Sequence, residues 1–260
     1  MNDLFVKGVK EHLNIDDIDL ILFEEVESTN TTLREFAEGG TKEKTVVVSN
    51  SQSGGKGRMG RSFYSPVDSG IYMSVCLRPD IDIADSVFVT TAAAVAVSRA
   101  IDKLYGLNSK IKWVNDIYID DKKVCGILTE CVTNLETSKP KYIILGIGIN
   151  LFVSEEGFPN DISSIAGAIL DKRKDVLSEK ARLIANVLNE FFSIYPSLQN
   201  DDVYDEYCNK MFLTDKTVYV SGRQNCEARV LGVNRDYSLQ VEINGEKVAL
   251  NSGEVSAKIV

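Results

Sequence analysis

The spacing of apolar residues changes near residue 213 and divides the chain into two parts. Before that point, short runs of β-branched residues alternate with stretches whose apolar residues recur every three or four positions. The predicted helices are 31–38, 85–105, 178–195 and 201–211, and the predicted strands are 45–49, 71–77, 110–114, 117–120, 123–131 and 142–149. This mixture of elements predicts an α+β domain.

The helix predicted at 178–195 has the clearest amphipathic pattern. Ser178 is placed to cap its first turn, six apolar residues form a stripe along it, and Pro196 stops it. The helix predicted at 85–105 is followed by Gly106, a residue that favours the end of a helix. Both patterns predict helices that pack through one apolar face.

From Thr214 onward, the pattern changes to short strands of alternating polarity separated by turn residues. Asn244 and Gly245 are typical of the two-residue turn that joins the strands of a hairpin. About 47 residues of this kind predict a small antiparallel barrel. We therefore expect a first domain at 1–212 and a second at 213–260.

Composition and charge fit a soluble globular protein. The 260 residues are 44% hydrophobic and 26% charged, and the net charge of −9 argues against nucleic acid as the main partner. The five cysteines include no Cys-x-x-Cys pair and His12 is the single histidine, so we expect reduced thiols and no zinc site. The apolar stretches are too short or too interrupted to cross a bilayer, and the N-terminus lacks a signal-peptide pattern. These features predict a cytoplasmic protein.

A loop at residues 55–61 combines three glycines with three cations. Its Gly-x-Gly-x-x-Gly pattern occurs in dinucleotide-binding folds, but these need a helix directly afterwards, and residues 62–66 contain two aromatics and a proline. The Walker pattern also fails, because no Gly-Lys is followed by Ser or Thr. Two interpretations remain open. The loop is either a flexible surface hairpin or a phosphate-binding loop in which Lys56, Arg58 and Arg61 neutralise phosphate oxygens.

Three further segments carry groups that suit a ligand. Residues 112–116 place Lys112, an aromatic residue and a polar pair at the end of a strand. Residues 28–30 supply hydroxyl and amide groups before a helix, where helix capping is the alternative interpretation. Residues 146–150 put two glycines inside a buried strand, which lets a ligand approach the backbone. Phe63 is placed either to stack on a nucleobase or to pack in the core.

In their order and spacing, these segments resemble the biotin protein ligase family. The resemblance rests on residues 28–30, on Gln52 with residues 55–61, and on residues 112–116, 123–128 and 146–150. It extends from about Glu25 to Asn150, and the predicted C-terminal module also fits as an SH3-like β-barrel. It implies a mixed-sheet catalytic domain at 1–212 and a reaction in two steps. Biotin and ATP give biotinyl-5′-AMP and pyrophosphate, and a lysine of a biotin carboxyl carrier protein then takes the biotin.

The resemblance also implies roles for individual residues. Lys112 would stabilise charge on the reacting carboxylate and the α-phosphate, and Arg58 would be the second catalytic group. The implied biotin-binding residues are Ser28, Thr29, Asn30, Gln52, Gly55, Lys56, Arg58, Lys112, Gly126, Gly146 and Gly148. The implied ATP-binding residues are Lys56, Arg58, Arg61, Phe63, Lys112, Asn115 and Asn150. ATP is expected to enter as its Mg²⁺ complex, with no metal ligands assigned and no tightly bound metal or prosthetic group.

Four positions depart from the usual family pattern. Val114 stands where proline is common, Lys56 and Met59 stand where arginine is common, and Phe63 stands where tryptophan is frequent. Val114 alters the end of the strand without removing a reactive group, and Phe63 keeps a stacking face with less area. A lysine at position 56, however, meets a phosphate as a point charge and lacks the bidentate fork of arginine.

Other interpretations stay open on the sequence alone. A lipoate–protein ligase shares the catalytic fold and the adenylate chemistry. Some biotin ligases also act as repressors through an N-terminal winged helix, but the 27 residues before Ser28 are too few for that domain, so we expect no DNA binding. Lys112 argues against a biotin sensor without catalysis. The expected partners are biotin, ATP and the carrier domain, with no membrane, and the sequence is compatible with a monomer or a homodimer.

Overall fold

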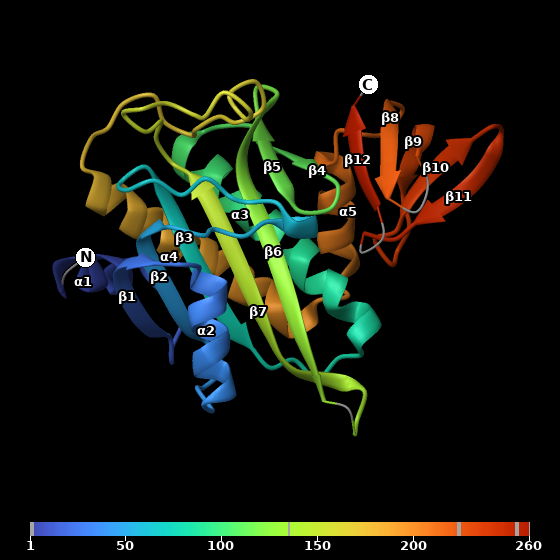
Figure 1. Ribbon diagram of the computed structural model, residues 1–260. Coiled ribbons are helices and arrows are strands. Elements are labelled where there is room, and N and C mark those ends of the chain that lie inside the picture. The colour runs from blue at the N-terminus through green and yellow to red at the C-terminus, as the bar shows by residue number, and fades with distance from the viewer. Residues whose placement is uncertain (1–2, 135, 223–224, 253–254, 260) are drawn as a thin grey trace.

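The computed structural model describes residues 3–134, 136–222, 225–252 and 255–259. Its larger sheet has seven strands in the order β1-β2-β3-β7-β6-β5-β4 (Figure 1). β1 runs parallel to β2 and the other neighbours are antiparallel, so the sheet is mixed, as predicted. The strands are β1 (Asp19–Val26), β2 (Thr45–Gln52), β3 (Gly70–Leu77), β4 (Lys110–Lys112), β5 (Asp116–Ile119), β6 (Lys122–Asn134) and β7 (Lys139–Asn150).

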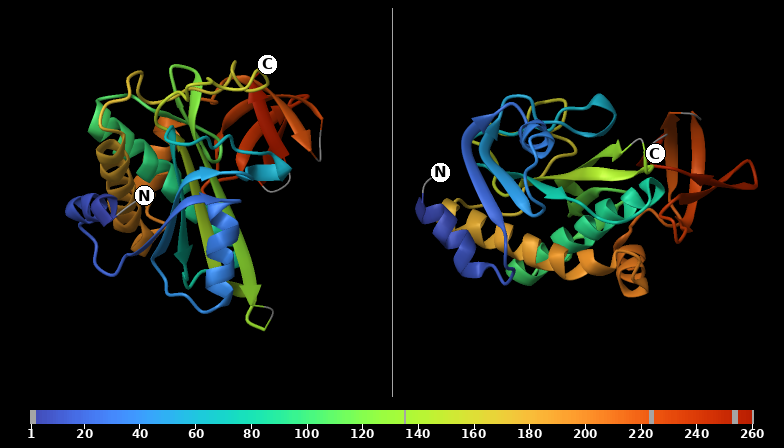
Figure 2. Two further views of the ribbon diagram at one scale, coloured as in Figure 1. Left: turned by 60° about the vertical axis from the view of Figure 1, so that its left-hand side comes forward. Right: turned by 90° about the horizontal axis from the view of Figure 1, so that it is seen from below.

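Helices lie on both faces of this sheet (Figure 2). On one face, α4 (Val176–Ile194) packs against α1 (Asp3–His12) and α3 (Ser86–Tyr105), and α5 (Asp201–Lys210) packs against α3 and β4. The main hydrophobic core lies on that side. On the opposite face, α2 (Thr29–Glu38) packs against β2, β3 and β7 over a smaller apolar cluster. Beside α2, the connection from β2 to β3 crosses in front of β6 and β7 (Figure 1).

The helical segment Ile83–Tyr105 is long and apolar enough by composition to cross a membrane. Most of it is buried, because α3 packs against α4 on one side and against β6 on the other. Its residues Val95, Ala96 and Val97 have no exposed surface. This is the pattern of a core helix in a globular protein.

The predicted helices are present, with some shifted ends. α3 matches its prediction to one residue, and Gly106 ends it in a left-handed conformation (φ 65°). α2 begins at Thr29, two residues earlier than predicted. The cap predicted at Ser178 is wrong, because α4 also begins two residues earlier, at Val176, and Asp175 precedes it.

Two elements near the N-terminus were not predicted. α1 carries a charge every few residues, and only its side with Phe5 and Val9 is buried. β1 is an edge strand that pairs with β2 alone, so its outer positions tolerate Asp19 and two glutamates. In both elements, charged residues on the exposed side interrupt the apolar pattern from which a helix or strand would be predicted. The strand predicted at 110–114 is also shorter than expected, since the chain turns after Lys112.

The smaller sheet is antiparallel and has five strands in the order β11-β10-β9-β8-β12. Its strands are β8 (Thr217–Gly222), β9 (Cys226–Val233), β10 (Leu239–Ile243), β11 (Glu246–Leu250) and β12 (Val255–Ile259). Asn244 and Gly245 have φ angles of 52° and 84°, which confirms the predicted hairpin turn. The sheet fits a small barrel-like module, although in the described part of the chain no pairing closes it between β11 and β12. The division of the chain into domains at residue 213 stays a prediction.

The smaller sheet contacts the turn that follows β4. Trp113 donates a hydrogen bond from Nε1 to the Tyr237 carbonyl at 2.8 Å. From α5, the Tyr207 hydroxyl donates to the Val114 carbonyl at 3.2 Å. The Trp113–Val114 peptide bond is cis. The turn directly after Lys112 is therefore held by both α5 and the smaller sheet.

Candidate active site

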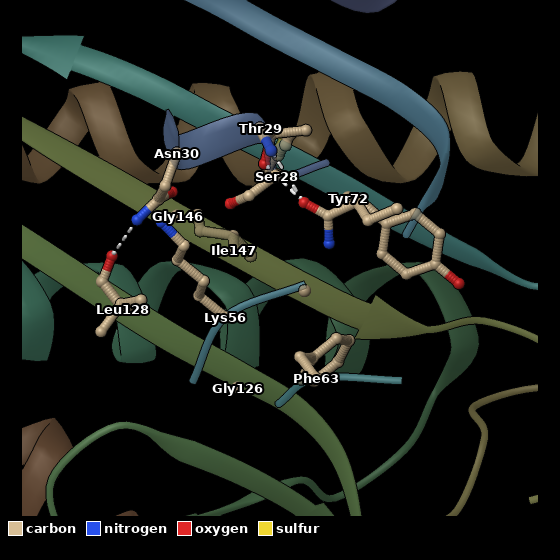
Figure 3. Close-up of a pocket in the computed structure, with 13 residues that line it drawn as sticks. Ser28, Thr29, Asn30, Lys56, Phe63, Tyr72, Gly126, Leu128, Gly146 and Ile147 are labelled. Atoms are coloured by element: carbon tan, nitrogen blue, oxygen red, sulfur yellow. Dashed lines mark hydrogen bonds between the residues drawn. The ribbon is translucent and has the colours of Figure 1, made fainter. Parts of the chain in front are cut away.

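A small polar cavity of about 30 Å³ lies on the α2 face of the larger sheet (Figure 3). It is formed by the start of α2, by β3, β6 and β7, and by the β2–β3 connection. Its lining residues are Ser28, Thr29, Asn30, Gln52, Lys56, Phe63, Tyr72, Met73, Gly126, Leu128, Gly146, Ile147 and Gly148. Most of the residues predicted to bind biotin therefore meet here from distant parts of the chain. We call this space the acid cavity.

The first residues of α2 form a hydrogen-bonded wall of this cavity. The Thr29 backbone N–H and hydroxyl donate to Gln52 Oε1 at 2.8 and 3.2 Å, and Gln52 Nε2 donates to Ser65 Oγ at 2.8 Å. Ser28 precedes the helix as its N-cap residue, but its side chain makes no capping hydrogen bond. Because Ser28 is 2% exposed, its hydroxyl is a buried polar group beside the cavity. Helix capping therefore does not account for it.

Asn30 is fixed by partners on two strands, β3 and β6. Its Oδ1 accepts a hydrogen bond from Ser74 Oγ at 2.6 Å, and its Nδ2 donates to Glu130 Oε2 at 2.7 Å and to the Leu128 carbonyl at 3.4 Å. Arg34 donates to the other oxygen of Glu130 at 2.8 Å. Ser74 and Glu130 were not among the predicted site residues. The signals that could have identified them were a serine inside the apolar strand β3 and a glutamate in the middle of β6.

Three glycines let side chains approach the sheet closely. A Cβ atom at Gly146 would overlap the Asn30 carboxamide. At Gly148 and Gly126, a Cβ atom would lie 2.6 and 3.3 Å from the Phe63 ring. The ring therefore rests directly on the backbone of β6 and β7. The sequence suggested that these glycines let a ligand approach the backbone. The close packing of Asn30 and Phe63 against them is an equally good explanation.

A larger cavity of about 470 Å³ lies on the other side of Phe63. All seven residues predicted to bind ATP line it, namely Lys56, Arg58, Arg61, Phe63, Lys112, Asn115 and Asn150. Arg58 and Lys112, which were also predicted to bind biotin, line this cavity but not the acid cavity, and Gly55 lines neither. We call this space the nucleotide cavity. It shares Lys56, Phe63, Gly126 and Leu128 with the acid cavity.

Two cations of the glycine loop, Lys56 and Arg58, donate hydrogen bonds to neutral protein groups. Arg58 donates to Asn115 Oδ1 at 3.0 Å and to the Ser252 carbonyl of the smaller sheet. Burial lowers the pKa of the Arg58 guanidinium, and the nearby Asp116 carboxylate opposes this effect. Lys56 donates from Nζ to Thr31 Oγ1 at 2.7 Å. The loop thus holds positive charge at the boundary between the two cavities.

Two lysines face the nucleotide cavity in different places. Lys112 Nζ lies 5.8 Å from the centre of the Tyr118 ring. Lys123 Nζ lies 2.7 Å from Asp116 Oδ1 and 3.2 Å from the position that a Cβ atom on Gly126 would take. Gly126 borders both cavities, so the Lys123 ammonium, which lines the nucleotide cavity, lies close to their junction. The sequence motif included Lys123, but no role was predicted for it.

An apolar wall of the nucleotide cavity was also missed. It includes Phe158, Ile162 and Ile165, which lie in the long loop after β7. The loop returns to β6, where the Lys123 N–H donates to the Ile165 carbonyl at 2.8 Å. Asn150 Nδ2 anchors the same loop by donating to the Gly167 carbonyl at 3.0 Å. A loop without periodicity gives no sequence signal for such a wall.

Metal ligands stay unassigned. Within the described residues, no group of three or more His, Cys, Asp or Glu side chains is arranged to hold a metal ion. Asp116, an acidic side chain that lines the nucleotide cavity, is paired with Lys123.

Comparison with known proteins agrees with this arrangement. The model of the biotin/lipoate A/B protein ligase family matches residues 22–150, which carry both cavities apart from the loop after β7 and Phe212. The chain belongs to this family. Among curated proteins, it is similar to the bifunctional ligase/repressor BirA of Bacillus spizizenii, with 37% identity over 169 residues, or 65% of this chain and 51% of that protein. It is also similar to the biotin–[acetyl-CoA-carboxylase] ligase of Mycobacterium tuberculosis, with 25% identity over 88% of this chain and 85% of that protein.

The fold has close structural relatives. A biotin protein ligase from Aquifex aeolicus in complex with biotin and ATP matches with a TM-score of 0.75 and 23% identity, over 93% of this chain and 99% of that chain. The chain spans about half the length of the Bacillus relatives that it matches.

Proposed function

We propose that this protein activates biotin with ATP as biotinyl-5′-AMP and transfers the biotin to a lysine of a biotin carboxyl carrier protein. The observation that carries the proposal is the junction of the two cavities at Lys56, Phe63, Gly126 and Leu128. A small acid on one side and a nucleotide on the other would place the carboxylate against the α-phosphate there. Family membership and the biotin and ATP complexes of structural relatives support the same pairing.

Biotin would occupy the acid cavity. Its ureido group both donates and accepts hydrogen bonds, which suits the hydroxyl and amide groups of Ser28, Thr29, Asn30 and Gln52. A cavity of about 30 Å³ holds about one water molecule. Binding therefore requires the side chain of Phe63 or Lys56 to move away from the strand backbone.

ATP would occupy the nucleotide cavity as its Mg²⁺ complex. Arg58, Lys56 and Arg61 would bind phosphate oxygens, and Phe63 would offer a face to the adenine ring. A biotin carboxylate oxygen then forms a bond to the α-phosphorus, and the bond from that phosphorus to the bridging oxygen breaks. Pyrophosphate leaves with the electron pair. Two anions meet in this step, so nearby ammonium groups lower its barrier by offsetting their repulsion.

Lys112 and Lys123 are both placed to supply such a charge. Lys112 was the candidate from sequence, and it lines the nucleotide cavity. Lys123 lies at the cavity junction beside Gly126, so we propose that its ammonium is the closer of the two to the reacting carboxylate. Its ion pair with Asp116 fixes the position of the ammonium before the substrates arrive.

The test is pyrophosphate release by the purified protein with ATP and biotin, compared with ATP and lipoate. Release with biotin and a mass increase of one biotinyl group on a carrier domain are expected. Activity with lipoate alone would instead identify a lipoate–protein ligase. We also propose that the protein acts in the cytoplasm, where carrier domains of carboxylases are made.

A further inference from the structure

A third depression lies on the outer side of the glycine loop. This groove, of about 570 Å³, runs between the loop and β6 and is bordered by Ser252 of the smaller sheet. We call it the outer groove. Lys56 and Leu128 line the outer groove, the acid cavity and the nucleotide cavity alike. Three separate spaces therefore meet at the same two side chains.

A biotin ligase must bring ATP and an amine to the same biotin carboxyl group. ATP reacts with an oxygen of this group, and the amine then reacts with its carbon. If biotin and ATP occupy the two cavities, the acyl–phosphate bond lies at their junction and both cavities are full. The third reactant, an amine on a macromolecule, must then approach from outside. The outer groove is open to solvent and ends at the same junction. It offers a path to the acyl carbon that crosses neither bound substrate.

Glu130 gives this path a group that suits an amine. It is the single carboxylate among the groove-lining residues that the structure describes. Asn30 donates a hydrogen bond to one of its oxygens at 2.7 Å, and Arg34 forms an ion pair with the other at 2.8 Å. A carboxylate accepts about four hydrogen bonds, so both oxygens keep further capacity. The side chain is 25% exposed, so a ligand in the groove can reach it.

We propose that the outer groove admits the acceptor lysine of the carrier domain and that Glu130 binds its ammonium group. This inference rests on the proposed function. Without the adenylate, Lys56, Arg58 and Arg61 make the groove cationic and disfavour an ammonium. Once the adenylate phosphate has neutralised part of that charge, Glu130 attracts the lysine.

The transfer step balances without a further reactant. The ammonium loses one proton to water in the groove, and the amine nitrogen forms a bond to the acyl carbon. The bond from that carbon to the phosphate oxygen breaks, and AMP leaves with the electron pair. The nitrogen then loses its second proton to water. Glu130 and Leu128 are two residues apart on one side of β6, or about 7 Å, so a lysine side chain reaches the junction by changing rotamer.

The experiment separates the two steps in Glu130→Gln. Adenylate formation is measured by trapping with hydroxylamine, a nucleophile small enough to need no groove, and transfer is measured with a carrier domain. We expect kcat/KM for the carrier to fall about tenfold, mainly through KM, as for the loss of one hydrogen bond to a charged group. Hydroxylamine trapping should fall by a smaller factor, because the amide oxygen introduced at this position can still accept the hydrogen bond from Asn30. Glu35→Gln removes the same charge from an exposed position on α2 and is the matched control.

Each outcome decides between the explanations. Equal losses with both nucleophiles would mean that Glu130 acts through Asn30 on the acid cavity, and this would overturn the inference. Unchanged carrier transfer would also overturn it. No adenylate in the wild-type protein would instead refute the proposed function. Ser252→Tyr narrows the groove from its opposite side and keeps the backbone carbonyl, so it should also impair transfer to the carrier more than trapping by hydroxylamine.

Discussion

A methyl group at position 146 should damage the acid cavity without touching a reactive group. In Gly146→Ala, the new carbon would lie 2.8 Å from Asn30 Cγ, so the carboxamide must move. It would lose its hydrogen bonds with Ser74 at 2.6 Å and with Glu130 at 2.7 Å. A neutral bond contributes about 1 kcal/mol and one to a charged group about 2 kcal/mol, so the loss is roughly 3 kcal/mol. This corresponds to a Tm decrease of roughly 6–12 °C.

The assay combines thermal unfolding with the KM for biotin in pyrophosphate release. KM should rise at least about tenfold, because the displaced Asn30 side chain enters the space that the ligand needs. Gly8→Ala is the control, since a Cβ atom there would meet Ala181 at an ordinary 3.5 Å and Ala is favoured in the helix α1. An unchanged Tm and biotin KM in Gly146→Ala would refute the reasoning.

Three further results follow from the same geometry. Lys123→Met should slow adenylate formation about 100-fold in single-turnover pyrophosphate release, and Lys112→Met should slow it less. A larger loss in Lys112→Met would return the main role to Lys112, as expected from sequence. Phe63→Ala should raise the KM for ATP about tenfold, whereas Phe63→Trp should keep it near wild type, if the ring stacks on adenine. Burial lowers the pKa of Lys180 from 10.5 to about 8, although the nearby Asp68 carboxylate raises it in part. Between pH 8 and 10.5, Lys180 is therefore protonated in the unfolded chain and mostly neutral in the folded one. As the pH rises from 7.5 to 9.5, the unfolding free energy of the wild type should rise by about 2 kcal/mol relative to that of Lys180→Met. Urea titrations at several pH values measure both, and an equal pH dependence of the two proteins would contradict the prediction.

The sequence predicted the fold best where both sides of an element are buried. α3 and β7 are covered from two directions, so their apolar patterns were continuous and their positions were correct within a few residues. α1 and β1 each have one exposed side, and their charged residues concealed them. The Asn244–Gly245 turn was predictable because both residues tolerate the positive φ that a two-residue hairpin needs.

The candidate site was predictable only in part, for a different reason. Family motifs identified residues that face the cavities, because a motif contains the residues that line the site. A motif does not contain the residues that hold those side chains in place. They did not identify Ser74 and Glu130, whose importance comes from the Asn30 carboxamide that they hold. They gave a role to Lys112, at the end of β4, and none to Lys123, near the start of β6. Only the position of Lys123 beside Gly126 distinguishes the two.

The partners of the cations in the glycine loop explain how these side chains are held in place and can still bind a phosphate. Lys56 donates to the Thr31 hydroxyl, and Arg58 donates to the Asn115 amide and the Ser252 carbonyl. All of these acceptors are neutral. A phosphate oxygen carries negative charge, so it adds a Coulomb attraction to the cation that the neutral acceptors lack. The neutral partners therefore keep the loop in place without competing seriously with a nucleotide. A carboxylate in any of these three positions would instead hold the cations and oppose phosphate binding.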